Sequence, residues 1–131
     1  MTQKRIEAFL QIADEEMAAA ERLQAPLPKQ AEYFLQQTVE KLIRATLEAA
    51  EILAGTAHSL SFLAGMLPSS HKLRLRYMEF EHLSSASTRY RYPSGTGVIH
   101  TIYADEVARD LARARMLRTE DWNSLKSEGF L

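Results

Sequence analysis

Residues 31–47 are the segment that most constrains the fold, because they have the pattern of one long amphipathic helix. Apolar and small side chains recur there at three- and four-residue steps, which places them on one helical face. These side chains are Phe34, Leu35, Thr38, Val39, Leu42 and Thr46. The sequence therefore predicts an all-α protein in which this segment is the central helix of a bundle.

The rest of the chain predicts an up-and-down bundle of about five helices. We expect these helices at about residues 2–23, 29–53, 57–67, 71–88 and 102–119. Pro26 and Pro28 end the first helix, Gly55 is expected to end the second, and Thr56 is expected to cap the third. The short linker after the first helix predicts an antiparallel return. The inward positions expected in the fourth helix are Leu73, Tyr77, Phe80, Leu83 or Ser84, and Ser87.

With 131 residues, the chain is long enough for one domain with a buried core. We expect a single domain over residues 1–131, with a helical core at 2–120 and a C-terminal tail at 121–131, whose last residues either fray or dock through Phe130. No apolar run is long enough to span a membrane, and the polar N-terminus is not that of a signal peptide. Cysteine is absent, which excludes disulfides and thiolate metal sites and agrees with a cytoplasmic location.

A polar line runs along the central helix beside its apolar face. Gln37, Lys41, Arg44 and Glu48 follow one another at i, i+4, i+7 and i+11. The plain interpretation is a solvated face on which Glu40 and Arg44 pair. The alternative is a ligand site, because the net charge of −1 hides a basic excess in the second half of the chain that could receive phosphates.

The histidines give no sign of a metal site or a cofactor. His58, His71, His82 and His100 are scattered, and none has another histidine or a carboxylate at a recognised ligand spacing. We therefore predict no metal and no cofactor. His58 lies in the first turn of the expected third helix and is the best acid–base candidate of the four, but it has no local partner.

Three segments taken together resemble the HEPN domain family. Residues 34–45 are similar to the family's QQAxEKxxKA helix, residues 57–60 to its tHdL segment, and residues 91–93 to its RYP signature. The order and spacing of the three match, an Ala/Arg-rich helix follows as expected, and the resemblance covers about residues 2–120. The chain departs from the pattern at Thr38, Arg44 and Ser59, where the family usually has alanine, lysine and an acidic residue.

The resemblance implies a bundle like the C-terminal domain of kanamycin nucleotidyltransferase. It also implies a non-catalytic binding module that forms homodimers and engages a nucleotide-type ligand, RNA or a small, separately encoded nucleotidyltransferase. Glu40 also matches one of the family's polar positions. The other matching positions are the ligand-binding candidates Gln37, Lys41, Arg44, His58, Arg91 and Tyr92. A structural homodimer without a ligand is a further alternative.

The ligand-binding candidates could converge in an antiparallel bundle. Three of them share one face of the central helix, and Arg91 and Tyr92 lie where the chain leaves the fourth helix, an end that can lie over the central one. Cations beside an aromatic ring suit a phosphate and a base. In the alternative arrangement, Arg91 pairs with Glu40 or another acid and Tyr92 packs in the core, so that the cluster is an internal brace.

A different branch of the family consists of metal-independent ribonucleases, among them toxins of toxin–antitoxin pairs, with an Arg-x(4–6)-His motif. Arg76 and His82 fit this spacing and define the catalytic alternative. Two features argue against it. In an unbroken helix these side chains would diverge by about 120° around the axis. Tyr77 also follows the arginine, where the nuclease branch prefers Asn, Asp or His.

Overall fold

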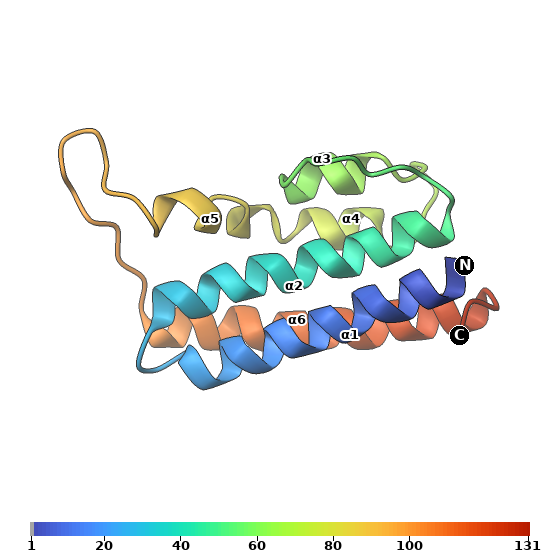
Figure 1. The fold of residues 1–131 in the computed structure, drawn as a ribbon, viewed down its shortest axis with the longest axis horizontal. Helices are drawn as coiled ribbons and strands as arrows, with labels where there is room; N and C mark the ends of the chain where they lie inside the picture. The colour runs from blue at the N-terminus through green and yellow to red at the C-terminus, as the bar shows by residue number, and fades with distance from the viewer. Residues whose placement is uncertain (1) are drawn as a thin grey trace.

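The computed structural model describes residues 2–131, apart from the side chain of Ser87. Every regular element of the described chain is helical (Figure 1). The long helices are α1 (Thr2–Leu23), α2 (Pro28–Ala49) and α6 (Ala104–Ser127). Between α2 and α6 lie the short helices α3 (Leu60–Gly65), α4 (Arg74–Met78) and α5 (Ala86–Arg89), with the 3₁₀ helix η1 (Glu81–Leu83) before α5. The predicted all-α, up-and-down bundle is confirmed.

Helix α2 is the centre of the bundle, as predicted. Helices α1 and α6 pack along one side of it, and the short elements form a row along the other (Figure 1). The side chains of Leu35, Val39 and Leu42 have no exposed surface. Burial of one such side chain contributes about 1.5–3 kcal/mol to the free energy of folding. Helices α1, α3, α5 and α6 and the 3₁₀ helix η1 all contact α2.

The predicted fourth helix, residues 71–88, is broken into α4, η1 and α5. The inward positions Tyr77, Phe80 and Leu83 are buried as expected, whereas the side chain of Ser87 lies outside the described part of the chain. Tyr77, Phe80, Leu83 and Ala86 follow one another at three-residue steps, which is the period of a 3₁₀ helix. The backbone agrees, since Phe80 N donates to Tyr77 O and Leu83 N donates to Phe80 O. The sequence pattern thus predicted the buried face correctly, but it predicted one continuous helix where the structure has three short ones.

The C-terminal end of α2 also differs from the prediction. The helix ends at Ala49 rather than near residue 53. Glu51, with φ of 59°, takes the left-handed conformation that ends the helix, and Gly55, with φ of 66°, lies in the segment that follows. The N–H of Ile52 donates to the carbonyl of Leu47 at 2.9 Å. This bond defines a Schellman motif, which closes the last turn before the expected end.

Helix α3 begins later than predicted, and Thr56 is not its N-cap. Ser59 is the N-cap, because its Oγ accepts a hydrogen bond from Phe62 N at 3.3 Å. Glu81 of η1 accepts a second bond from this helix end, from Ser61 N at 2.6 Å. Two donors of the first turn are thus satisfied.

The last helix is longer than predicted. Helix α6 continues past Thr119 to Ser127, so the first part of the expected tail is helical. Asp121 lies on this added part, is fully buried, and accepts a hydrogen bond from the Tyr77 hydroxyl at 2.7 Å. Phe130 follows the helix and is half-buried against the core, as expected. None of the described helices has the length and apolar character needed to cross a membrane.

Candidate functional site

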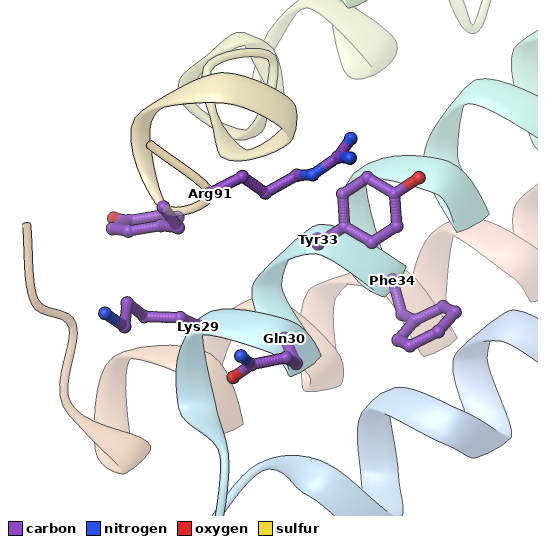
Figure 2. A pocket seen from close by; sticks show the side chains of 6 residues that line it. Lys29, Gln30, Tyr33, Phe34 and Arg91 are labelled. Atoms are coloured by element: carbon purple, nitrogen blue, oxygen red, sulfur yellow. The ribbon is translucent and has the colours of Figure 1, made fainter. Parts of the chain in front are cut away.

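Arg91 follows α5, and its side chain lies over the first turns of α2 (Figure 2). Its guanidinium carbon is 5.6 Å from the centroid of the Tyr33 ring and 5.7 Å from that of Tyr92, which are cation–π distances. Among the described residues, Arg91 has no carboxylate at ion-pair distance. The alternative with an Arg91–Glu40 pair and a buried Tyr92 does not form, since Tyr92 is 61% exposed.

A pocket of about 360 Å³ opens beside Arg91 and is lined by Lys29, Gln30, Tyr33, Phe34, Tyr90 and Arg91. A second hollow, of about 400 Å³, shares three of these side chains and adds, among others, Arg89, Tyr92 and His100. No carboxylate lines either hollow within the described chain. We call the two together the Arg91 pocket. It combines three cations with three tyrosine rings.

Sequence reasoning found Arg91 and Tyr92 but missed the side chains that α2 supplies to the pocket. Lys29 and Tyr33 lie two turns and one turn before Gln37, at four-residue steps along the same helix. The polar line therefore begins at Lys29, and extending its spacing backwards would have found both side chains. Lys29 is half-buried and forms no ion pair with a described residue.

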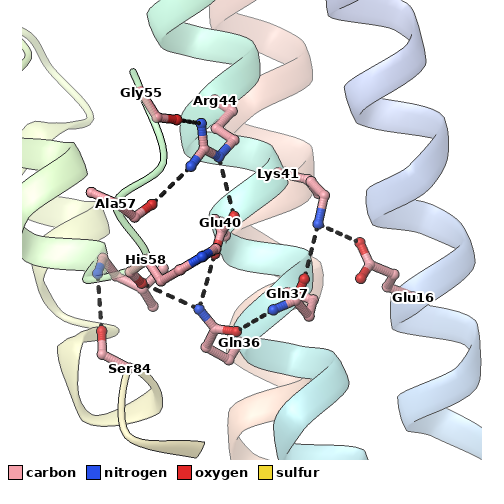
Figure 3. A network of polar contacts seen from close by, with 11 residues as sticks. Glu16, Gln36, Gln37, Glu40, Lys41, Arg44, Gly55, Ala57, His58 and Ser84 are labelled. Carbon is pink, nitrogen blue, oxygen red and sulfur yellow. Dashed lines mark hydrogen bonds and ion pairs between the residues drawn. The ribbon is translucent and has the colours of Figure 1, made fainter. Parts of the chain in front are cut away.

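The middle of the polar line forms a different structure, an internal network centred on Glu40 (Figure 3). Glu40 is only 4% exposed. Its Oε2 accepts a hydrogen bond from Arg44 Nε at 3.1 Å. Its Oε1 accepts one from Gln36 Nε2 at 3.2 Å and lies 3.1 Å from His58 Nδ1. The predicted Glu40–Arg44 pair is confirmed, but the polar face is half-buried rather than solvated.

Arg44 fastens the segment between α2 and α3 to the central helix. Its Nη1 donates to the carbonyl of Gly55 at 3.0 Å and its Nη2 donates to the carbonyl of Ala57 at 2.8 Å. With the bond to Glu40, three nitrogens of one planar group are in use. The ammonium of a lysine is a point charge and could not make this set of bonds in fixed directions. The arginine at this position therefore suits a structural role.

Lys41 extends the network to α1. Its Nζ donates to Gln37 Oε1 at 3.1 Å and forms an ion pair with Glu16 at 3.3 Å. Burial raises the pKa of Glu16, and the charge and hydrogen bond of Lys41 offset part of that rise. Gln37 in turn donates to Gln36 at 2.7 Å. The predicted candidates Gln37, Lys41, Arg44 and His58 thus lie in one network, and Arg91 and Tyr92 lie apart from it.

Comparison with known protein families identifies the family to which this helical bundle belongs. The family model of the HEPN domain matches residues 6–120, a range that contains both the network and the Arg91 pocket. The chain belongs to the HEPN domain family. No curated protein and no solved structure matches it significantly. The closer likeness of this HEPN domain to the C-terminal domain of kanamycin nucleotidyltransferase stays a prediction.

The two residues of the ribonuclease alternative each contact carboxylates in this HEPN domain. Arg76 Nε donates to Glu120 at 3.0 Å, and its Nη1 pairs with Glu79. His82 Nε2 lies 2.9 Å from Asp110 Oδ1, and this hydrogen bond raises the pKa of His82. Because the helix between Arg76 and His82 is broken, the expectation that the side chains diverge around one continuous axis does not apply.

Within the described chain, one group of side chains has the chemistry and the spacing to hold a metal ion. Glu32, His82 and Asp110 each place one ligand atom within 4.8 Å of the others. The three residues come from α2, η1 and α6, far apart in sequence. Ligand spacing along the chain could not reveal such a group, which is why the sequence predicted no metal site.

Proposed function

We propose that this HEPN domain is a non-catalytic module that binds a phosphate-bearing, nucleotide-type ligand in the Arg91 pocket. The observation that supports the proposal is the state of Arg91, a cation between two tyrosine rings without a carboxylate partner in the described chain. Guanidinium groups bind phosphate through paired, charge-assisted hydrogen bonds. An exposed guanidinium held by two rings is thus ready for an anion.

The surroundings of Arg91 support a phosphate in the same way. Lys29 lies in the first turn of α2, on the pocket wall. The positive end of a helix dipole adds to the attraction for an anion at this position. No carboxylate among the described residues of the pocket wall opposes it. The phosphate is therefore expected between Lys29 and Arg91.

The aromatic side chains give the base a place to stack. Tyr92 exposes 61% of its surface beside Arg91, and stacking of a base on an aromatic ring contributes about 1–3 kcal/mol. The two hollows, of about 360 and 400 Å³, are of the size that small ligands occupy. In this proposal Arg91 and Tyr92 keep their predicted binding roles, while Gln37, Lys41, Arg44 and His58 hold the scaffold.

The proposal is tested by calorimetric titration with ATP, AMP and adenosine. Arg91→Ala should weaken the binding of ATP and AMP by about tenfold or more. Arg109→Ala is the matched control, because Arg109 is 61% exposed on α6 and, among the described residues, pairs only with its helical neighbour Asp105. The affinity should fall as salt rises, and adenosine should bind more weakly than AMP. The absence of any nucleotide binding below millimolar, or equal losses in both variants, would contradict the proposal.

The family resemblance adds a protein partner to the same proposal, a small nucleotidyltransferase encoded separately. A nucleotide in the Arg91 pocket would give the two proteins a common ligand. Co-expression with a nucleotidyltransferase encoded beside this chain should yield a stable complex. Failure of such a pair to co-purify would remove the partner and leave the nucleotide site to be judged by titration.

A further inference from the structure

Two buried carboxyl groups and a histidine converge where α2, η1 and α6 meet. Glu32 on α2 is 3% exposed and Asp110 on α6 is 7% exposed. His82 of η1 closes the group from the solvent side, with Nε2 2.9 Å from Asp110 Oδ1. One ligand atom of each residue lies within 4.8 Å of the other two. The group is thus compact and open to solvent mainly through the histidine.

Glu32 is only partly satisfied by its contacts within this group. Its Oε2 atom is buried and has no hydrogen-bond partner in the described chain. A buried polar atom without a partner destabilises the folded state. Burial first, and then the hydrogen bond and the charge of Asp110, raise the pKa of Glu32 to about 9. The buried Oε2 atom of Glu32 is therefore an oxygen that a bound cation could contact.

We propose that Glu32, His82 and Asp110 bind a divalent transition-metal ion, with Zn²⁺ as the best match. One imidazole nitrogen and two carboxylate oxygens are ordinary Zn²⁺ ligands, and three protein ligands leave a fourth position for water. With both carboxylates ionised and the imidazole neutral, the ligands carry two negative charges, which balance the ion. The half-exposed His82 gives a path of entry, since 46% of its side chain is accessible.

The charged neighbours of the group do not remove the attraction for a cation. Glu106 adds a third acid next to Glu32, while Arg89 and Arg113 are the cations that act on Glu32 and Asp110. The ligand atoms would have to close to about 3.4 Å from one another around a zinc ion. Rotation of the half-exposed His82 ring and of the Glu32 carboxyl group, whose Oε2 atom has no hydrogen-bond partner in the described chain, would allow this closure.

The chain offers a matched control in the pair of His58 and Glu40. His58 Nδ1 lies 3.1 Å from Glu40 Oε1, much as His82 lies from Asp110, but the neighbouring group there is the cation of Arg44. The described structure places no second carboxylate at that pair. If exposure of a histidine beside one carboxylate were enough to bind zinc, His58 and His82 would contribute equally to zinc binding.

The test compares metal-free wild type, Glu32→Gln and His58→Ala, each with and without Zn²⁺ as the only added probe. Glu32→Gln should fold, because an amide resembles the neutral carboxyl group in shape, and its melting without metal verifies this. We expect Zn²⁺ to raise the Tm of wild type and of His58→Ala, and to bind Glu32→Gln about tenfold more weakly or worse.

Three outcomes would overturn the proposal. They are a wild type that does not bind Zn²⁺ in calorimetry, a Glu32→Gln variant that binds it as tightly as wild type, and a His58→Ala variant that loses the response. The proposal does not depend on the nucleotide site, because every measurement is made without nucleotide.

Discussion

Two arginines of this chain show how the partners of a side chain decide its role. Arg44 has 14% of its side chain exposed and bonds to a buried carboxylate and two carbonyls. Arg91 is exposed, with two tyrosine rings and no carboxylate among the described residues. Arg44 uses its hydrogen bonds within the fold, whereas in our proposal those of Arg91 are available to a ligand. Sequence alone placed both in the same candidate site.

Local pairs were predictable at the scale of residues, and distant pairs were not. The Glu40–Arg44 pair follows from the i, i+4 spacing of a helix. The contact of His58 with Glu40 and that of Arg91 with Tyr33 depend on how separate elements pack. A single sequence does not determine such packing. The sequence therefore identified candidate residues that the structure divides between two places, the network around Glu40 and the Arg91 pocket.

Asp121 makes a prediction about the pH dependence of stability. Complete burial raises its pKa from 3.8 to about 8, although hydrogen bonds from Tyr77 and Thr46 and the charge of Arg118 oppose the rise. Between these values the folded state holds a proton that the unfolded state releases. The stabilisation from this group is therefore complete below about pH 4 and is lost as pH rises to about 8, by at most about 1.4 kcal/mol per pH unit.

Asp121→Asn removes this titration and keeps an oxygen that can accept from Tyr77. The free energy of unfolding of wild type should fall more steeply from pH 5 to pH 8 than that of the variant, as measured by urea denaturation. Glu32, whose pKa is also raised, contributes a slope of the same sign to both proteins and cancels in the comparison. Parallel pH profiles would show that Asp121 is ionised in the folded state.

At the scale of elements, the faces of helices were predictable and their ends were not. The apolar stripes of α1 and α2 fix which side is buried, because helical periodicity is a strong signal. The break at η1 was visible only as a run of three-residue steps from Tyr77 to Ala86. The end of α2 was misplaced because Gly55 was the expected stop, whereas Glu51 adopts the left-handed conformation.

The ends of α2 and α6 make a paired prediction. Both close with a Schellman motif, but the left-handed residue is Glu51 in α2 and Gly129 in α6, with φ of 59° and 87°. A side chain in this conformation costs about 1–2 kcal/mol. Glu51→Gly should therefore raise the free energy of unfolding by about 0.5–1 kcal/mol, and Gly129→Ala should lower it by a similar amount.

Chemical denaturation measures both changes, and Glu51→Ala is the control. It removes the charge but keeps the Cβ atom, so it should not produce the gain of Glu51→Gly. An equal gain in both variants would assign the effect to the charge of Glu51 instead of its backbone conformation.

At the scale of the whole molecule, a homodimer stays a prediction. The family resemblance implies one, and the segment after α5, which projects from one end of the bundle, exposes several large apolar side chains (Figure 1). These are Tyr92, Val98, Ile99 and Tyr103, each at least 56% exposed. Exposed apolar side chains gathered in one segment are typical of a contact surface.

Light scattering during size-exclusion chromatography tests the dimer. We expect a mass of about twice the 14.9 kDa of the chain, and a lower mass for Ile99→Asp. Leu53→Asp is the control, because Leu53 is 92% exposed in the segment between α2 and α3. A wild type that elutes only as a 14.9 kDa species at micromolar concentration would contradict the prediction.

Helix α2 serves two purposes along its length. Its first turns carry Lys29 and Tyr33 into the Arg91 pocket, and its middle turns hold α1 and the α2–α3 segment through Lys41 and Arg44. We propose that the first turns of α2 bind the ligand and that its middle turns stabilise the fold. This division explains why one polar line on one helix contains residues of both kinds.

One measurement tests this division most directly, namely the Tm and the ATP affinity of Arg44→Ala and Arg91→Ala determined on the same samples. Arg44→Ala strands the buried Glu40 and should cost about 3 kcal/mol of stability, seen as a lower Tm, while ATP affinity stays unchanged. Arg91→Ala should leave the Tm unchanged and weaken ATP binding by about tenfold or more. A lower Tm for Arg91→Ala with intact ATP binding, or loss of ATP binding in Arg44→Ala with an unchanged Tm, would contradict the account.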